Sequence, residues 1–226
     1  MGELRLVYDA SNYVFLATLA HDRFGEGLGI YKPSQGERPL HDFPPGTLYE
    51  REVGAYQLSR LLGWNLIPPT VERGGPQGVG SMQLYIEHDP SQHYFDFREQ
   101  DSLHEQLIRF AAFDLVANNA DRKGGHLLLD GDGRLWGIDN GLCFHSQRKL
   151  RTVVWDFAGE PLPDRCVEDL ERAAECLVSG DESADALRRC LSEPEREALA
   201  ARCRELAGHP VLPEMFPYRC VPWPMI

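Results

Sequence analysis

Three short runs of β-branched and aromatic residues open the chain, at positions 4–8, 13–19 and 28–32. Polar and glycine-containing stretches separate them, a pattern typical of an antiparallel meander of three strands. The glycine-rich residues 25–29 have the composition of a dinucleotide-binding fingerprint, but that motif must open a helix and this run leads into a strand. We therefore predict a hairpin loop at residues 25–29.

The next segment has the start and stop features of a helix. Thr47 and Glu50 have the spacing of a capping box, in which the two side chains bond each other's backbone N–H groups. The pattern predicts a helix over about residues 48–62 that ends at Gly63, because a glycine commonly follows the last helical turn. Residues 79–87 then have the pattern of a fourth strand or a strand pair.

A second helix, a polar loop and a hairpin follow. Ser102 and Glu105 repeat the capping-box spacing, and apolar residues continue from there at helical intervals. The predicted helix leads into a loop rich in turn-forming residues at 118–125. Residues 126–139 contain two apolar runs joined by Gly-Asp-Gly, which predicts a β-hairpin.

Short amphipathic helices are predicted for the rest of the chain, at 167–178, 184–191 and 193–206. The last 17 residues hold five prolines and three aromatic residues, so we expect an extended segment that packs on the body. This order predicts a single α+β domain with an antiparallel sheet lobe over residues 1–88, a mainly helical lobe over 89–226, and a cleft between them.

Composition narrows the choice of ligands. The chain is 42% hydrophobic and 26% charged, as in ordinary globular proteins, and its 23 basic against 35 acidic residues give a net charge of −12. This balance argues against nucleic-acid partners. The sequence shows neither an export signal nor an apolar run of about 20 residues. We therefore expect a cytoplasmic protein without integral membrane association. The six cysteines contain no C-x-x-C pair, which favours buried thiols over a zinc or redox site.

Lys32 ends the third predicted strand, in Gly-Ile-Tyr-Lys-Pro. A lysine that points from a strand into a cleft is suited to nucleotide phosphates and needs a carboxylate to hold it in place. Glu52 lies one turn inside the first helix and can supply that carboxylate, whereas the capping box engages Glu50. Without the rest of the pattern, Glu52 would be an ordinary solvated helix residue.

Two aspartates occupy positions that suit phosphoryl transfer. Asp121 lies in the loop before the hairpin, and Asp139 follows its second strand 18 residues later (139 − 121 = 18). The reaction needs one carboxylate to orient or deprotonate the attacking hydroxyl and another to hold the metal that bridges the phosphates. Each aspartate alone would be a turn residue, but together they match both roles.

Ala-Asp-Arg-Lys-Gly-Gly-His at 120–126 and Gly-Ile-Asp-Asn-Gly-Leu at 137–142 resemble the catalytic loop and metal motif of the phosphatidylinositol 3-/4-kinase group. The likeness is strongest to type II phosphatidylinositol 4-kinases and extends more distantly to HipA-type protein kinases. Residues 31–33, 52–58 and 80–84 resemble the lysine strand, the following helix and the hinge entry of the same group. The resemblance runs in order over about residues 5–145 and includes small bacterial kinase-like proteins whose substrate is uncharacterised.

The resemblance implies a bilobal, atypical kinase-like fold that binds ATP with Mg²⁺ or Mn²⁺. Lys32 is implied to contact the α- and β-phosphates, with Glu52 paired to it. Asp121 is the implied catalytic aspartate and Asp139 the principal metal ligand.

Further nucleotide contacts are implied for the sheet lobe. Ser11 and Asn12 would cover the phosphates in place of a glycine-rich loop. Adenine would lie against the segment Gln83, Leu84 and Tyr85.

His126 departs from the family pattern. The position five residues after the catalytic aspartate normally holds an asparagine that is the second metal ligand. Imidazole is softer than the oxygen donors that magnesium prefers, and it suits manganese. The change is consistent with an altered metal preference, with degenerate catalysis, or with a histidine packed beneath the hairpin.

A basic cluster after Asp139 is the candidate docking site for an anionic acceptor, and it is formed by His145, Arg148, Lys149 and Arg151. The alternative is an ordinary solvated charged loop. The acceptor itself, whether a small molecule, a lipid or a protein, stays open.

The leading hypothesis is an ATP-dependent kinase that transfers the γ-phosphate to a hydroxyl acceptor. A second hypothesis is a nucleotide-binding pseudokinase whose partner surface is the helical C-terminal region. A third is transfer of AMP, with the same residues and the nucleotide reversed.

Overall fold

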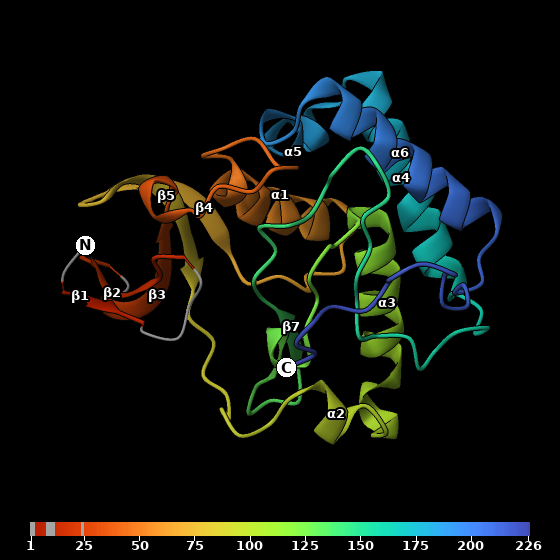
Figure 1. Cartoon of the computed structure of the whole chain (residues 1–226), viewed down its shortest axis with the longest axis horizontal. Helices are drawn as coiled ribbons and strands as arrows, with labels where there is room; N and C mark the ends of the chain where they lie inside the picture. Colours follow the sequence, from red (N-terminus) through yellow and green to blue (C-terminus); the bar gives the residue numbers. More distant parts are fainter. Residues whose placement is uncertain (1–2, 8–11, 24) are drawn as a thin grey trace.

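The computed structural model describes residues 3–7, 12–23 and 25–226. A twisted sheet forms one end of the molecule and helices form the other, so the fold is bilobal and kinase-like (Figure 1). Each lobe has its own apolar core, because a small cluster of Ala17, Tyr31 and Met82 is separate from the large cluster among the helices. Each of the two lobes thus has its own core. The predicted α+β class is confirmed.

Five antiparallel strands make the sheet, in the order β1-β2-β3-β5-β4. Their bounds are β1 Leu4–Leu6, β2 Phe15–His21, β3 Gly25–Pro33, β4 Thr70–Gly75 and β5 Gly78–Leu84. The prediction of a strand pair around residues 79–87 was right in kind, but the pair begins earlier, at Thr70. Lys32 lies opposite Ser81 in the register of β3 and β5, near the end of β3 that faces the helical lobe.

The predicted loop at residues 25–29 is wrong. These residues belong to β3 and pair with residues 17–21 of β2, and the turn includes Asp22 and Arg23. Glycines disfavour a strand by their flexibility alone, but here the ladder to β2 offsets that cost.

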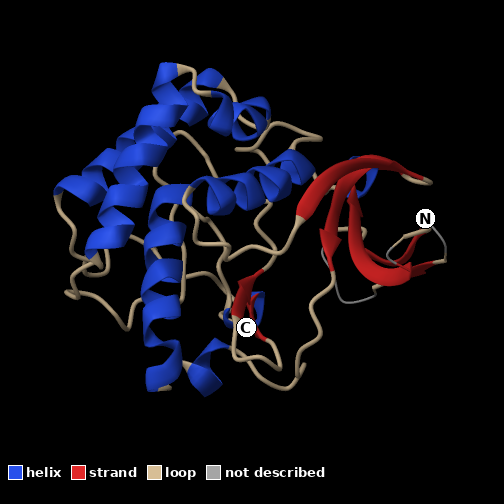
Figure 2. Cartoon of the chain, turned by 180° about the vertical axis from the view of Figure 1, so that it is seen from behind, coloured by secondary structure: helices blue, strands red, loops and turns tan. Residues whose placement is uncertain are grey.

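Helices build the second lobe around α3, which stands at its centre (Figure 2). Their bounds are α1 Leu48–Leu61, α2 Tyr94–Phe97, α3 His104–Ala117, α4 Asp164–Ser179, α5 Asp185–Arg189 and α6 Glu193–Gly208. Leu107, Phe110 and Phe113 of α3 are fully buried because they repeat at helical spacing on its packed side. Within the part of the chain that is described, no helix is long and apolar enough to cross a membrane.

Both predicted capping boxes are wrong, although the helices form where expected. The Thr47 hydroxyl donates instead to Pro44 O at 2.8 Å. Glu37 caps α1 from a distant loop, where its carboxylate accepts from the amides of Leu48 at 3.1 Å and Tyr49 at 2.9 Å. A carboxylate at a helix N-terminus satisfies the same free N–H groups as a capping box, so local spacing did not reveal which acid supplies it.

At the second helix, neither member of the predicted box caps α3. The helix begins at His104 with no side-chain cap, and Glu105 forms an ion pair with Arg109 one turn on.

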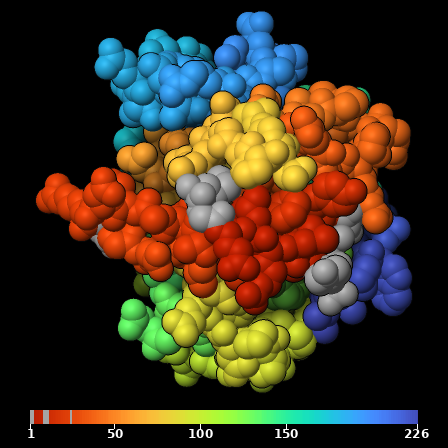
Figure 3. All heavy atoms as spheres, turned by 90° about the vertical axis from the view of Figure 1, so that its left-hand side faces the viewer, coloured from red at the N-terminus to blue at the C-terminus, as the bar shows by residue number. Residues whose placement is uncertain are grey.

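The predicted hairpin is confirmed as β6 Leu127–Leu129 and β7 Leu135–Gly137. It sits at the centre of the molecule, between the sheet and α3 (Figure 1). The C-terminal segment is extended and packs on the body as expected, since Gly124 donates to Met225 O at 2.7 Å and Thr152 donates to Cys220 O at 3.0 Å. In the view from the sheet end, the first strands lie between the C-terminal helices and residues near 100 (Figure 3).

Gly80 marks a close approach of β5 to β3. A Cβ atom there would lie 2.2 Å from Lys32 O and 2.6 Å from Pro33 Cα, both of which are backbone atoms. We expect Gly80→Ala to lower the free energy of unfolding by about 1–3 kcal/mol, as overpacking does.

Gly74, in the neighbouring strand, is the matched control because a Cβ atom there meets nothing within 4 Å. Gly74→Ala is expected to be neutral or to stabilise by about 0.5–1 kcal/mol. Urea unfolding of both variants measures the difference, and equal effects would contradict this account of Gly80.

Candidate functional site

Three elements far apart in the sequence meet at the side chain of Lys32. Its Nζ atom, on β3, forms ion pairs with Glu52 Oε1 of α1 and, at 2.8 Å, with Asp139 Oδ1 after β7. Lys32 is mostly buried and Glu52 is almost entirely so, whereas half of the Asp139 side chain is exposed. Of the residues predicted from the sequence, the structure therefore brings these three into direct contact.

Glu52 has a second contact that the sequence did not suggest. Its Oε2 atom accepts from the backbone amide of Asn140 at 3.0 Å, so one carboxylate holds both Lys32 and the loop that carries Asp139. Glu50 instead accepts from the hydroxyl of Tyr49, at 3.3 Å. Glu52 was thus preferred for a wrong reason, since no capping box engages Glu50, but Glu52 is the acid that faces the lysine.

The charges in this cluster stabilise one another. Burial alone would lower the pKa of Lys32, but the carboxylates of Asp139 and Glu52 raise it above its ordinary value. The ammonium of Lys32 in turn holds the pKa of Asp139 far below its usual range. Both groups are therefore ionised at neutral pH, which the predicted roles of phosphate contact and metal ligand require.

Asp121 lies in the loop after α3, and its carboxylate is one-third exposed. Its Oδ2 atom is 3.6 Å from Lys123 Nζ, and its backbone amide donates to Asn119 Oδ1 at 3.0 Å. Burial raises the pKa of Asp121, the charge of Asp139 raises it further, and Lys123 opposes the shift. The carboxylate is consequently a better proton acceptor than an ordinary surface aspartate.

His126 faces Asp139 directly, with Nε2 3.3 Å from Asp139 Oδ2. Its Nδ1 atom accepts from the amide of Lys123 at 3.4 Å, so the neutral ring carries its proton on Nε2 and directs it at Asp139. Burial, together with nearby cations that include Lys32, lowers the pKa of His126 to about 4. A neutral imidazole is the form that can bind a metal.

Asp139 and His126 are the predicted metal ligands, and their side chains lie close enough together that both could contact one ion. Among residues 3–7, 12–23 and 25–226, no group of three or more His, Cys, Asp or Glu side chains could hold one. Metals in phosphoryl-transfer sites take one or two protein ligands and complete their shell with phosphate oxygens and water. The pair therefore fits a metal that arrives with a nucleotide better than a closed structural site.

A fully buried ion pair underlies the loops of the site. Arg122 Nε lies 3.1 Å and 3.2 Å from the two carboxylate oxygens of Asp114, and both side chains are inaccessible to solvent. The rest of the guanidinium donates to Ile138 O at 2.8 Å and to Asn140 Oδ1 at 2.7 Å. Asp114 also accepts from the hydroxyl of Thr152 at 2.8 Å. One arginine thus joins α3, the Asp121 loop and the Asp139 loop.

Neither Arg122 nor Asp114 was predicted from the sequence to have a role. The available sign was the position of Arg122 directly after Asp121, inside the motif that resembles a catalytic loop. Asp114 gave no such sign, because it lies within the apolar run of α3 and nothing in the sequence indicates which arginine it meets.

The predicted nucleotide contacts in the sheet lobe do not form a cluster like the one around Lys32. Ser11 lies outside the described residues, and Asn12 Oδ1 accepts from the amide of Arg38 at 2.9 Å. Gln83 is buried and donates its side-chain amide to Thr70 Oγ1 at 2.9 Å.

Leu84 and Tyr85 are exposed at the end of β5, where the chain leaves the sheet for the helical lobe. This position suits a flat apolar ligand, so these two residues stay the predicted adenine contacts.

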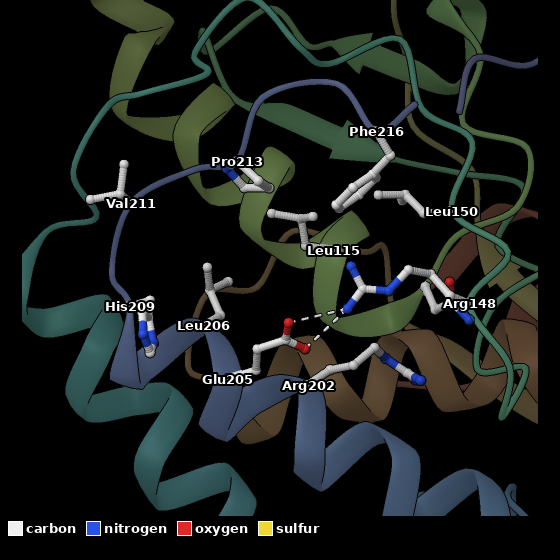
Figure 4. Close-up of a pocket in the computed structure, with 11 residues that line it drawn as sticks. Leu115, Arg148, Leu150, Arg202, Glu205, Leu206, His209, Val211, Pro213 and Phe216 are labelled. Atoms are coloured by element: carbon white, nitrogen blue, oxygen red, sulfur yellow. Dashed lines mark hydrogen bonds and ion pairs between the residues drawn. The ribbon is translucent and has the colours of Figure 1, made fainter. Parts of the chain in front are cut away.

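Ion pairs already engage half of the predicted basic cluster. Arg148 contacts both carboxylate oxygens of Glu205, at 3.1 Å and 3.2 Å. That pair borders a largely apolar cavity between α3, α6 and residues 211–216 (Figure 4). Lys149 Nζ lies 3.1 Å from Asp42 Oδ2, so neither cation is free to form a common patch with its neighbours.

The other two members of the cluster have different surroundings. The ring of His145 packs edge-on against Phe43, with 5.3 Å between their centroids. Arg151 lies close enough to Asp121 for its charge to oppose the rise in the pKa of that carboxyl. Arg151 is therefore the member of the cluster that is placed beside the predicted catalytic loop.

Comparisons with known proteins agree with this geometry. Residues 57–185 match the family described as phosphatidylinositol 3- and 4-kinase. This range contains Asp121, His126 and Asp139, while Lys32 and Glu52 precede it. The chain is also 39% identical over 228 residues to Protein Rv2133c of Mycobacterium tuberculosis (strain ATCC 25618 / H37Rv), with 86% of this chain and 81% of that protein covered.

Several solved structures share the fold at low sequence identity. The proinflammatory kinase CtkA of Helicobacter pylori matches with a TM-score of 0.51 at 12% identity over 93% of each chain. Fam20 of hydra, solved with sugar, matches with 0.50 at 14% identity over 90% of this chain and 82% of that one. HipA of Shewanella oneidensis, in complex with HipB and operator DNA, matches with 0.51 at 11% identity, with 92% and 66% covered.

The buried pair of Arg122 and Asp114 gives a direct stability test. Asp114→Asn leaves the buried guanidinium without a counter-charge, and we expect a loss of about 3–5 kcal/mol in the free energy of unfolding. Glu205→Gln breaks the exposed pair with Arg148 and is the matched control, with an expected loss below about 1 kcal/mol. Urea unfolding compares the two, and a small loss for both would argue against a structural role of the buried pair.

Proposed function

The chain belongs to the phosphatidylinositol 3- and 4-kinase family, and we propose that it is an ATP-dependent phosphotransferase that transfers the γ-phosphate of ATP to a hydroxyl group. The observation that carries the proposal is the meeting of Lys32, Glu52 and Asp139 at one point, with Asp121 on the adjacent loop. A phosphate-binding cation, a metal-binding carboxylate and a base are the parts that this reaction requires.

In the proposed complex, Lys32 binds the α- and β-phosphates and Glu52 keeps it in place. Asp139 and His126 would hold Mg²⁺ or Mn²⁺, which would neutralise charge on the phosphates. The acceptor oxygen attacks the γ-phosphorus, the bond from that phosphorus to the β-γ bridging oxygen breaks, and ADP leaves. Asp121 orients the acceptor hydroxyl and takes its proton, a role that its raised pKa supports.

The acceptor in this proposal carries a negative charge close to the reacting hydroxyl. Lys123 is 3.6 Å from Asp121, and Arg151 is also near that carboxylate. In a chain with a net charge of −12, two cations beside the proposed base favour an anionic group at this point. A lipid headgroup, a phosphorylated metabolite and an acidic protein segment share this chemistry.

His126 favours a second candidate, a nucleotide-binding protein without transfer activity. The imidazole stands where the family pattern has an oxygen donor, and its proton points at Asp139 in the ground state. Metal ligation through Nε2 must move that proton to Nδ1 and give up the contact with Lys123. Manganese accepts imidazole more readily than magnesium does, so the choice of metal separates the two candidates.

The proposal is tested with purified protein, ATP labelled on either the γ- or the α-phosphate, and Mg²⁺ or Mn²⁺. Phosphatidylinositol vesicles, free inositol phosphates and a protein mixture serve as separate acceptors. Transfer of γ-label that Asp121→Asn and Asp139→Asn both abolish would support the kinase. Binding without transfer under all conditions would favour the second candidate, retained α-label would indicate AMP transfer, and absence of ATP binding would refute the nucleotide site itself.

Glu52 and Glu50 offer a matched pair of variants. Glu52→Gln removes the charge that holds Lys32, and we expect ATP affinity to fall by about tenfold, equivalent to about 1.4 kcal/mol. Glu50→Gln removes the same charge two residues away, where the carboxylate accepts from the hydroxyl of Tyr49 and not from Lys32, and is expected to leave affinity unchanged. Calorimetric titration with ATP and metal measures both, and an equal loss in the two variants would count against the role of Glu52.

The pH dependence of transfer gives an independent check of Asp121. The carboxylate must be ionised to accept a proton, so kcat should fall as the pH drops through a pKa that lies above the ordinary value for aspartate. Lys123→Met removes a cation that lowers this pKa, and the acid limb should therefore move to higher pH.

Lys149→Met is the control for this experiment, because Lys149 pairs with Asp42. The control should leave the acid limb where it is. An acid limb that Lys123→Met does not move would mean that another group titrates.

A further inference from the structure

Arg51 is a buried arginine directly beside Glu52 on α1. It is 3% exposed, although arginine is among the residues that are rarely buried without a partner. Its Nη1 atom donates to Cys143 O at 2.8 Å, and its Nη2 atom lies 2.5 Å from Glu195 Oε1. Successive residues of α1 thus bind different parts of the molecule, with Glu52 holding Lys32 and Arg51 holding α6.

Glu195 is itself held in place before it meets Arg51. It lies in the first turn of α6, where its Oε2 atom accepts from the amide of Ser192 at 2.9 Å and from the hydroxyl at 2.7 Å. Its Oε1 atom remains for the arginine, and only 13% of the side chain is exposed. Burial would raise the pKa of Glu195, but the bonds from Ser192 and Arg51 hold it below its ordinary value.

Packing around Gly54 also brings α1 close to the residue after Cys143 and to the end of α5. A Cβ atom at Gly54 would lie 3.2 Å from the ring of Phe144 and 3.3 Å from Cys190 Cβ, so the helix backbone is close to both. The guanidinium of Arg51 also lies over the ring of Phe43, 4.8 Å from its centroid. In Figure 1, α1 accordingly runs from the sheet to a position beneath α5.

A buried ion pair of this kind fixes orientation more than it adds stability. The desolvation of two charges cancels much of their attraction, whereas the planar guanidinium accepts only a narrow range of geometries. Because residues 51 and 52 are about 100° apart around a helix, a rotation of α1 that moved Arg51 from Glu195 would also turn Glu52 away from Lys32.

We propose that Arg51 and Glu195 form a clamp that keeps α1 on the C-terminal helices in the one orientation that presents Glu52 to Lys32. The nucleotide-binding arrangement is then built into the fold, and no swing of α1 is needed to assemble it. Arg51 and Glu195 are positioning residues that act through Glu52, and the inference rests on the proposed binding of ATP at Lys32.

Glu195→Gln removes the charge of the clamp, while glutamine can still accept from Ser192 at the helix start. Because the buried Arg51 loses its counter-charge in this variant, urea unfolding is used first to verify that it is folded under the assay conditions. Glu193→Gln is the matched control, because Glu193 is an exposed acid in the same first turn. Two quantities are measured for each variant: the Kd for ATP with Mg²⁺ or Mn²⁺, and hydrogen exchange of the α1 amides in the unliganded protein. For Glu195→Gln we expect a loss of at least about fivefold in ATP affinity and faster exchange in α1, with neither change in the control.

The double variant Glu52→Gln/Glu195→Gln distinguishes positioning from general weakening. If Glu195 acts through Glu52, the double variant should bind ATP no more weakly than Glu52→Gln alone. Losses that multiply, or an affinity of Glu195→Gln equal to that of Glu193→Gln, would overturn the clamp. If the unaltered protein binds no ATP, the proposed function fails, and hydrogen exchange decides on the clamp alone: exchange in α1 equal in both single variants would refute it.

Discussion

The buried pair of Asp114 and Arg122 is the interaction on which the arrangement of the candidate site depends. A guanidinium without solvent must use its donors on fixed partners, and here those partners belong to α3 and the loop that carries Asp139. The geometry of one side chain therefore sets the spacing between the Asp121 loop and the Asp139 loop. Thr152 extends the same network, through Asp114, to the segment that follows.

Glu52 makes the corresponding link between the lobes. Its two oxygens bind Lys32 of the sheet and the amide of Asn140 beside Asp139, so a shift of either lobe would break one of these bonds. Arg51 connects the same helix to α6 through its ion pair with Glu195. Adjacent residues of one helix thus connect the sheet, the metal-motif loop and the C-terminal helices, and this explains how charges 107 residues apart, on Lys32 and Asp139, come to lie in contact.

Predictions from the sequence were correct where the pattern of nearby residues is enough to determine the structure. The alternation and periodicity of apolar residues gave most of the strands and helices, and the order of Lys32, Asp121 and Asp139 indicated the chemistry that the family comparison supports. It failed where a local motif competes with a distant partner. The capping boxes at Thr47 and Ser102 do not form, and Glu37, ten residues before Thr47, caps the helix instead.

The sequence by itself determined the kinds of elements, their order, and the residue types available for phosphate and metal binding, because these depend on intervals of a few residues along one chain. Apart from the pairing of Lys32 with Glu52, only the tertiary structure decided which charges pair. Three pairs show this: Arg51 with Glu195, Arg122 with Asp114, and Lys149 with Asp42. The two residues of a pair are 8 to 144 positions apart, and each pairing follows from how helices and loops pack in three dimensions.

The basic cluster shows the same limit: its members are neighbours in sequence, but folding gives Arg148, Lys149 and Arg151 separate partners or surroundings. Burial fixes such pairings, since a charge removed from water must find a counter-charge wherever the fold brings one.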